Sequence, residues 1–321
     1  MTYTDNSTEY KDFEAGEHYL QLDRTERDML DLVCSNFDNV IVVYNGANAM
    51  ELGFINEYSQ IKSAIWCPGT GQSGFEALGE IVAGTVNPSG KTSDTFVADL
   101  TATPTWNNFG YFKYDNMDEY AYTSNNFKTG EEETALPSFV NYVDGIYVGY
   151  RFYETAAAEG LINYDDTVVY PFGYGLSYTT FTQEMGAISE DNGTISFDVT
   201  VTNTGDVAGK DVVEVYYNPP YTNGGIEKAS ANLIQFEKTE VLQPDDSQTI
   251  TVSFDAEDMA SYDTYGAGCY VLEAGDYQIS INSDSHNVID SQTYTVVSTV
   301  TYDESNPRSC LLYTSPSPRD S

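Results

Sequence analysis

The sequence predicts two folded regions of different classes, an open α/β sandwich followed by an antiparallel β-sandwich. Two observations predict this order. Before about residue 88, apolar residues recur at helical spacing and in short continuous runs, which is typical of helices alternating with buried parallel strands. From residue 195 onward, apolar and polar residues alternate, as in strands with one buried face. A chain of 321 residues is long enough for about two domains.

The first predicted helix begins after Asp23 or Thr25, either of which can cap it. Glu26 and Asp28 lie three residues after these caps and complete a capping-box pattern. An apolar face then recurs at helical spacing in Met29, Leu30, Val33 and Phe37.

A continuous apolar run at residues 40–44 predicts a strand covered on both faces, as in a parallel sheet. Residues 63–66 predict a second strand, which precedes a glycine-rich turn and a helix carrying Phe75, Leu78 and Val82. The order helix, strand, strand, helix with short turns indicates an open α/β sheet.

The β-sandwich is predicted from short alternating runs separated by Pro, Gly and Asp turns. The apolar positions of these runs are Ile195, Phe197, Val199, Val201, Val213, Val215, Ile250, Val252, Phe254, Tyr277, Ile279, Ile281, Tyr294 and Val296.

The predicted domains are an α/β sandwich over residues 1–185, a β-sandwich over 186–300 and a linker over 301–309. Within the first domain, residues 88–181 are rich in Gly, Asn, Pro and Tyr and predict a long, mostly irregular connector that packs back on the α/β layer. Residues 310–321 look like one translated frame of a sequencing-library adapter, so we exclude them from fold reasoning.

Charge excludes several classes of partner. The 13 Lys and Arg residues against 50 Asp and Glu residues give a net charge of −37, which repels phosphate backbones and anionic lipids. We therefore expect no nucleic-acid partner and no membrane partner. The longest clean apolar stretch is that at residues 40–44, far short of the roughly 18 residues of a membrane span.

Cysteine and histidine usage predicts no metal and no cofactor. Cys34, Cys67, Cys269 and Cys310 are far apart, without a C-x-x-C pair, and the chain has two histidines. This spacing fits neither a zinc site nor a disulfide framework. The first residues lack the basic stretch and apolar core of an export signal. The sequence therefore slightly favours a cytoplasmic location over a secreted one.

Residues 69–74 match the G-x-G-x-x-G pattern of a dinucleotide-binding loop, after a strand and before a helix. The acidic residue at the expected distance, Asp94, follows a turn and not a second parallel strand. A tight strand-to-helix turn is therefore the favoured interpretation, with a nucleotide role as the alternative.

Glycoside cleavage uses a pair of carboxyl groups, one of them with a raised pKa. Glu17 stands out among the carboxyl groups because a Glu beside a glycine and aromatic residues could hold such a pKa. A solvated loop carboxylate is the favoured interpretation of Glu17.

Aromatic residues also gather around Gly145 and Gly149. They suit either stacking on sugar rings or interdomain packing, and interdomain packing is the favoured interpretation. They are Tyr142, Tyr147, Tyr150, Phe152 and Tyr153.

Three segments together resemble the signatures of glycoside hydrolase family 3, the family of many β-glucosidases. They are Pro-Phe-Gly-Tyr-Gly-Leu-Ser-Tyr-Thr at 171–179, Asp-Gly-Ile-Tyr-Val-Gly-Tyr-Arg-Phe-Tyr at 144–153 and Asn-Pro-Ser-Gly-Lys at 87–91. Residues 201–206 and 212–216 resemble the fibronectin-III-like domain of that family, as do 244–245 and 273–277. These resemblances run in the order of the family and extend from about residue 20 to 300.

The resemblance implies that part of a catalytic apparatus lies outside this chain. Family members carry the nucleophilic Asp on a (β/α)8 barrel, and no barrel pattern is present here. Their acid/base Glu lies in a glycine-rich segment ahead of an L-x-L stretch, which Leu20-Gln21-Leu22 resembles. Glu17 lies closer to Leu20 than the pattern has it, so the acid/base role is not carried over and the catalytic residues stay unassigned.

The resemblance therefore implies part of a retaining β-glycosidase that acts on a β-linked oligosaccharide or glucoside and is inactive without its barrel. A subset of the family has the barrel last, an order favoured by the linker-like residues 302–308. The alternative is a carbohydrate-binding or adhesive β-sandwich module without catalysis. Sugar and linkage specificity are left open.

Overall fold

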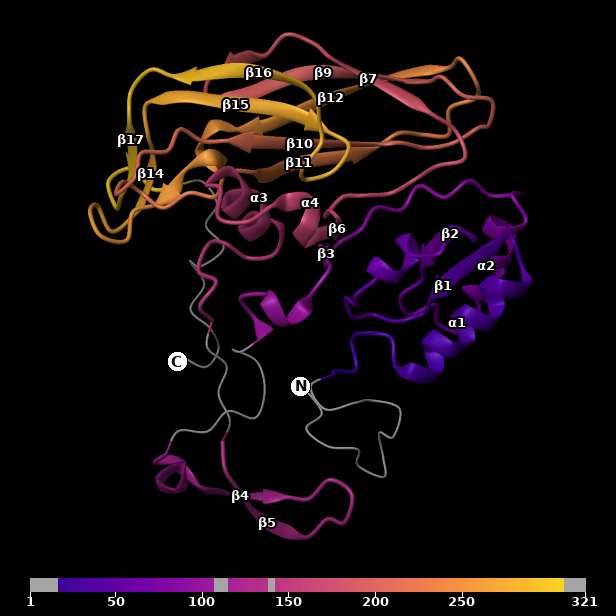
Figure 1. Ribbon diagram of the computed structural model, residues 1–321. Coiled ribbons are helices and arrows are strands. Elements are labelled where there is room, and N and C mark those ends of the chain that lie inside the picture. Colours follow the sequence, from indigo (N-terminus) through magenta and orange to yellow (C-terminus); the bar gives the residue numbers. More distant parts are fainter. Residues whose placement is uncertain (1–16, 107–114, 138–141, 309–321) are drawn as a thin grey trace. The chain divides into compact units, whose positions relative to one another are not determined.

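The computed structural model describes residues 17–106, 115–137 and 142–308, which form two compact units (Figure 1). The first unit contains the described residues up to Gly69 together with Phe96–Gly145 and Asp165–Val169. The second contains Thr70–Thr95, Ile146–Tyr164 and the described residues from Tyr170 onward. The adapter-like residues 310–321 lie outside the described residues.

In the first unit, helix α1 (Arg24–Asn36) begins at the predicted cap. The Asp23 side chain accepts a hydrogen bond from the Glu26 N–H at 2.7 Å, and the Glu26 carboxylate accepts from the Asp23 N–H at 3.0 Å. This reciprocal pair satisfies two backbone donors at the start of the helix and confirms the capping box. The predicted apolar face is only partly buried, because Leu30 is buried whereas Met29 and Phe37 are exposed.

Strands β1 (Val40–Tyr44) and β2 (Ile61–Trp66) form a parallel pair, which confirms the two predicted strands. The prediction that β1 is covered on both faces is not met among the described residues. Ile41 is 48% exposed and Val43 is 40% exposed, although both are apolar and β-branched. A parallel sheet is normally covered on both faces, so the exposure of these two side chains departs from the usual pattern.

The remaining elements of the first unit are short, and two of them, α4 (Tyr164–Thr167) and β6 (Val168–Tyr170), each extend by one residue, Tyr164 and Tyr170, into the second unit. Strand β3 (Phe96–Val97) pairs with β6 (Val168–Tyr170), and β4 (Tyr122–Asn125) forms a hairpin with β5 (Glu132–Ala135). Single 3-10 turns cover Gly53–Asn56, Leu100–Ala102 and Met117–Tyr120, and the short helix α4 covers Tyr164–Thr167.

The second unit is built on an antiparallel β-sandwich, as predicted from the alternating runs. One sheet has the strand order β11-β10-β15-β16, and the other has β12-β9-β7 with β8 paired to β9. The strands are β7 (Phe181–Met185), β8 (Ser189–Asp191), β9 (Thr194–Asn203), β10 (Val212–Asn218), β11 (Asn232–Lys238), β12 (Ser247–Asp255), β15 (Gly275–Asn282) and β16 (Val288–Val296).

The core of the sandwich consists of the alternate residues that face between the two sheets. Ile195, Val199 and Ile279 are completely buried there. Because strand side chains alternate between faces, the other set of residues on β10 and β15 lies on the opposite face of that sheet. This second face carries Glu214, Tyr216, Ser280 and Asn282, all of them buried.

A third, small sheet in the order β13-β14-β17 joins Ser261–Tyr262, Tyr270–Leu272 and Val300–Tyr302. Residues 301–309 were predicted as a linker, and the start of that range is the end of β17. Arg308 forms an ion pair with Asp258 at 3.1 Å and lies over the Tyr270 ring at 4.6 Å.

Helix α2 (Phe75–Val82) was predicted, whereas helix α3 (Tyr150–Ala158) was not. Helix α3 lies inside the segment that the sequence predicted to be mostly irregular. Its N-cap Gly149 offers no capping side chain, and its first five residues are all aromatic or charged. The usual sequence signals of a helix start are therefore weak there.

Candidate functional site

Glu17 lies half-buried in the first unit, directly before the buried side chain of His18. His18 Nδ1 accepts from the Leu20 N–H at 3.2 Å, and Nε2 lies 3.0 Å from Glu51 Oε1. Because Nδ1 is an acceptor, the ring carries its proton on Nε2 and donates it to Glu51. The same Glu51 oxygen accepts from the Leu100 N–H at 2.9 Å. His18 therefore fixes the segment that carries Glu17, and the acid/base role of Glu17 stays a prediction.

The glycine-rich loop at residues 69–74 forms a close turn before α2. The Gly74 N–H donates to the Thr70 carbonyl at 3.1 Å, and a Cβ at Gly74 would collide with that carbonyl. Gly71 has φ +64°, a left-handed conformation that favours glycine. Backbone geometry thus accounts for two of the three glycines of the pattern, whereas a Cβ at Gly69 would meet nothing within 4 Å.

The aromatic residues around Gly145 and Gly149 do not form one exposed platform. Tyr150 is stacked on Phe172 with ring centroids 4.7 Å apart, and its hydroxyl accepts from the Leu233 N–H at 2.8 Å. Tyr153 is buried, and Tyr142 belongs to the other unit. The contacts of Tyr150 and the burial of Tyr153 are those of packing residues.

Two of the three signature segments pack directly against each other in the second unit. The Asn87 Oδ1 accepts from the Ser177 hydroxyl at 3.0 Å and from the Tyr178 N–H at 2.8 Å. The Thr92 N–H donates to the Tyr174 carbonyl at 2.8 Å. Segments more than 80 positions apart in the chain are therefore tied together by the Asn87 side chain and by a backbone hydrogen bond.

Glycines make this close approach possible. Gly173 has φ +82°, and a Cβ there would collide with the carboxylate of Glu214. A Cβ at Gly175 would collide in the same way with the Gly90 carbonyl. A larger residue at Gly173 would displace the Glu214 carboxylate, and one at Gly175 would push the two signature segments apart.

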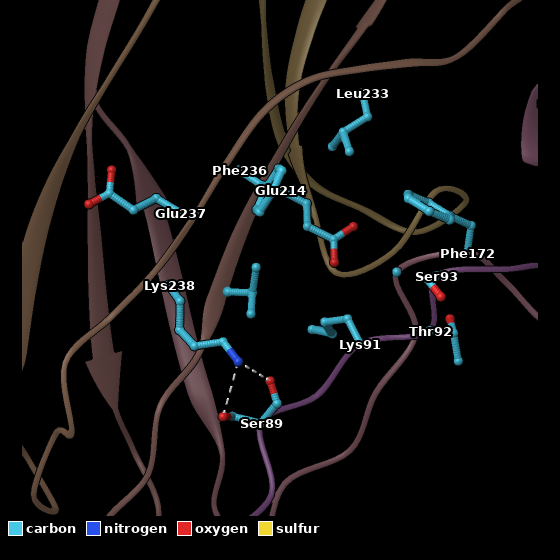
Figure 2. Close-up of a pocket in the computed structure, with 12 residues that line it drawn as sticks. Ser89, Lys91, Thr92, Ser93, Phe172, Glu214, Leu233, Phe236, Glu237 and Lys238 are labelled. Carbon is cyan, nitrogen blue, oxygen red and sulfur yellow. Dashed lines mark hydrogen bonds between the residues drawn. The ribbon is translucent and has the colours of Figure 1, made fainter. Parts of the chain in front are cut away.

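A cavity of about 480 Å³ lies where the signature segments meet strands β10 and β11 (Figure 2), within the size range of ligand sites. Its lining residues are Ser89, Lys91, Thr92, Ser93, Phe172, Gly173, Val212, Glu214, Leu233, Phe236, Glu237 and Lys238. Lys238 donates to the Ser89 carbonyl at 2.7 Å, and Lys91 donates to the Ser283 carbonyl at 2.9 Å. The cavity thus combines apolar walls with two ammonium groups.

Glu214 is the buried acid of this cavity. It is 4% exposed and accepts a hydrogen bond from the Tyr216 hydroxyl at 2.9 Å. Burial raises the pKa of Glu214 to about 7, even though nearby Lys91 and the Tyr216 hydroxyl favour the carboxylate. The pKa of Lys238 is lowered by burial and by Lys210 and Lys91.

The two glutamates of the cavity do not form a catalytic pair. In the pairing of β10 with β11, Glu214 lies opposite Phe236 and Glu237 lies opposite Val213. Paired residues project from the same face of a sheet and successive residues alternate, so Glu214 and Glu237 project from opposite faces. A retaining glycosidase needs two carboxyl groups about 5 Å apart on one substrate. Glu214 was not predicted as a site residue, because residues 212–216 were noted only for their resemblance to the fibronectin-III-like domain. A charged residue in the middle of the apolar run Val-Val-Glu-Val-Tyr was the signal that could have singled out Glu214.

The described residues contain neither a metal-ligand cluster nor a membrane-spanning helix. In residues 17–106, 115–137 and 142–308, no group of three or more His, Cys, Asp or Glu side chains is placed to hold a metal ion. Among the helices of those ranges, none has both the length and the hydropathy needed to cross a bilayer.

Comparison with known proteins identifies both parts of the chain. Residues 2–178 match the Glycosyl hydrolase family 3 C-terminal domain, and residues 211–285 match the Fibronectin type III-like domain. Beta-glucosidase A of Butyrivibrio fibrisolvens is 35% identical over 85% of this chain, and a beta-glucosidase of Ruminococcus albus is 33% identical over 85%. These matches span 31% and 26% of the two relatives.

Solved structures give the same result. A beta-glucosidase from Paenibacillus barengoltzii is similar with a TM-score of 0.72 and 31% identity, over 90% of this chain and 29% of that one. Beta-glucosidase 3B from Thermotoga neapolitana in complex with glucose is similar with a TM-score of 0.72 and 28% identity, over 91% and 36%. The family model covers more than half of the sequence, and the resemblance inferred from the signature segments is confirmed. The chain belongs to glycoside hydrolase family 3.

Proposed function

We propose that this chain is the non-barrel portion of a retaining, β-glucosidase-like glycosidase that removes terminal β-linked sugars. The observation that carries the proposal is the coverage of its relatives. Beta-glucosidase A of Butyrivibrio fibrisolvens aligns with 85% of this chain, but the alignment spans 31% of that relative. More than half of a β-glucosidase-like polypeptide therefore has no counterpart here.

The first unit supports the proposal independently. Strand β1 is apolar on both faces, and its Ile41 and Val43 are exposed among the described residues. Further polypeptide that covered this sheet would bury the exposed side chains and stabilise the unit. The barrel and its flanking segments are the partner we expect at that surface.

In the complete enzyme, we expect hydrolysis through a covalent glycosyl-enzyme intermediate. An Asp of the barrel would attack the anomeric carbon, and a second carboxyl about 5 Å away would protonate the leaving oxygen and later activate water. Glu17 is the acid/base candidate that the sequence offers. Without the nucleophile, the isolated chain is expected to be inactive.

The test first sequences the locus past the codon for Ser309 and expresses the longer product that it encodes. Hydrolysis of 4-nitrophenyl β-D-glucoside is then measured for this longer product and for the purified 321-residue chain. We expect no turnover above the enzyme-free control from the chain, and turnover from the longer product. Turnover by the isolated chain would contradict the assignment of the nucleophile to a separate barrel.

The role of Glu17 has a sharper test in the longer product. If Glu17 is the general acid, Glu17→Gln should lower cellobiose hydrolysis by about 10² to 10⁴. The loss should be smaller for an aryl glucoside, whose leaving group needs little protonation. Asp28→Asn, an exposed carboxyl on α1, is the matched control. Equal and small effects of both variants would remove Glu17 from the acid/base role.

The second candidate function is a carbohydrate-binding or adhesive module without catalysis. It is favoured by the 27 tyrosines of the chain and by exposed aromatic side chains such as Phe236. A locus that encodes no barrel on either side of this segment would place this function ahead of the first.

A further inference from the structure

The chain contains three Asn-Gly pairs, at residues 45–46, 192–193 and 223–224, and the structure describes all of them. Such a pair can react without a partner protein. The backbone nitrogen of the glycine attacks the side-chain Cγ of the asparagine, and the side-chain nitrogen leaves as ammonia with the proton of the glycine N–H. Water then opens the resulting succinimide ring to aspartate or isoaspartate. Glycine favours the attack because it has no Cβ to hinder the approach.

Hydrogen bonding, and not exposure, separates the three pairs. All three asparagines are exposed. The two groups that must meet are the glycine nitrogen and the asparagine carboxamide. Where hydrogen bonds hold these groups, the bonds must break in a local opening before the reaction can start. The pair whose reacting groups are not held should therefore react first.

Asn192 and Gly193 form the two-residue turn of the hairpin between β8 and β9, next to the paired residues Asp191 and Thr194. Asn192 Nδ2 donates to Asp191 Oδ1 at 3.0 Å, and the Gly193 N–H donates to Glu190 Oε1 at 2.6 Å. Both reacting groups of this pair are therefore held.

Asn45 and Gly46 follow strand β1 and are held in a different way. Asn45 Nδ2 donates to the Cys67 carbonyl at 2.7 Å, and the Gly46 carbonyl accepts from Trp66 Nε1 at 2.8 Å. A Cβ at Gly46 would also collide with the ring of Tyr44. The carboxamide is thus fixed, and the glycine is packed against an aromatic ring.

Asn223 and Gly224 lie at the tip of the loop between β10 and β11. The Gly225 N–H donates to the Thr222 carbonyl at 2.8 Å and closes a turn around them. Gly224 has φ +81°, and a Cβ there would meet nothing within 4 Å. Among the described residues, neither the Asn223 carboxamide nor the Gly224 N–H takes part in a hydrogen bond. Both reacting groups of this pair are therefore unrestrained.

The base of the same loop is anchored, in contrast to its tip. Lys228 is 5% exposed, donates to the Pro220 carbonyl at 2.6 Å and forms an ion pair with Glu273. The Tyr147 hydroxyl donates to Glu227. None of these contacts involves the turn at the tip, so a reaction there should leave the chain folded.

We propose that Asn223 is a site of spontaneous covalent modification, at which the carboxamide becomes the carboxylate of aspartate or isoaspartate while Asn45 and Asn192 stay intact. Each event replaces a neutral group by an anion, so the net charge of the chain changes from −37 to −38. The proposal does not depend on the proposed function, because neither a sugar nor the catalytic apparatus takes part.

The experiment incubates the 321-residue chain at mildly alkaline pH and follows the three pairs by peptide mapping with mass spectrometry. Isoaspartate is detected with an isoaspartyl methyltransferase, and a synthetic peptide of residues 219–228 gives the rate without a fold. We expect Asn223 to react at close to the rate of the peptide. Asn45 and Asn192 should react at least about tenfold more slowly, because two hydrogen bonds hold each pair. In concentrated urea the three rates should converge.

Asn223→Gln and Glu190→Ala are the matched variants. Asn223→Gln should abolish the acidic species on ion exchange, and the wild-type acidic species should melt at the same temperature as the unmodified chain. Glu190→Ala removes the acceptor of the Gly193 N–H and should speed the reaction at Asn192 about fivefold without changing the rate at Asn223.

Three results would overturn the proposal. They are equal rates at the three pairs of the folded chain, a rate at Asn223 about tenfold or more below that of the peptide, and an unchanged rate at Asn192 in Glu190→Ala. Because no glucoside is hydrolysed in this experiment, its failure and the failure of the proposed function are separate outcomes.

Discussion

Strands β9 and β1 are both rich in β-branched apolar residues, yet the protein buries them to different extents. In β9, Ile195, Val199 and Val201 are completely buried, because this strand is paired along both edges and faces a second sheet. In β1, Ile41 and Val43 are about half exposed, and the described residues supply one pairing partner, β2. The sandwich thus covers its own core, whereas the parallel sheet is left partly uncovered.

The largest expected effect is a difference in the free energy of unfolding between two variants, each of which truncates one isoleucine in one of the two regions. Ile279→Ala removes a completely buried side chain from the sandwich core and should lower the free energy of unfolding by about 2–5 kcal/mol. Ile41→Ala removes a side chain that is already half exposed and should cost less than about 1 kcal/mol. Urea denaturation of both variants measures the difference.

The comparison becomes sharper in the longer product of the locus. If further polypeptide covers the parallel sheet, Ile41→Ala should then cost about as much as a core substitution. An unchanged small cost would mean that this face of β1 stays open in the complete enzyme.

The next effect is the pH dependence contributed by Glu214. Its pKa is raised from 4.5 to about 7, so the folded state holds the proton to a higher pH than the unfolded state does. The contribution of Glu214 to stability is therefore fully present below pH 4.5 and is lost as the pH rises through about 7. The slope in this window is at most about 1.4 kcal/mol per pH unit.

The groups that face Glu214 are Lys91 and Tyr216, which favour its carboxylate, and Asp284 and Asp211, which disfavour it. Urea denaturation at several pH values between 4.5 and 8 should show a steeper decline in the wild type than in Glu214→Gln. Glu237→Gln on the neighbouring strand is the charge-matched control. Parallel profiles for the wild type and Glu214→Gln would contradict the raised pKa.

The smallest effect concerns the cap of α1. Asp23→Ala removes the side chain that accepts from the Glu26 N–H and should destabilise the first unit by about 1 kcal/mol. Because α1 buries only Leu30 and Cys34, capping makes an appreciable contribution to its stability. Asp28→Ala, on the same helix but away from the cap, should have a smaller effect on the same denaturation curve.

Local pattern was sufficient to predict α1, α2, the parallel strands β1 and β2 and the long core strands of the sandwich, but not the shorter elements. The Asp23 cap, the run at residues 40–44 and the alternation around Ile195 each lie within about ten consecutive residues. Helix α3 was missed because its cap is a glycine. Strands β7 and β11 were missed because Phe181–Met185 and Asn232–Lys238 alternate less regularly than the core strands.

The long-range contacts of the second unit could not be predicted from local pattern. Glu154 meets Ser285 across 131 positions and His286 across 132, and only the folded sheet brings them together. The burial of Glu214 depends on Gly173, from a distant segment that approaches closely because it lacks a side chain. The sequence nevertheless predicted the family, because its signature segments are those that make these long-range contacts.

Hydrogen–deuterium exchange on the isolated chain tests the contrast between the two regions most directly. The amides of β9, β10 and β15 should exchange only through global unfolding, whereas those of β1 and β2 should exchange orders of magnitude faster through local opening. Equal protection of both regions would contradict the claim that the parallel sheet depends on polypeptide beyond the described residues.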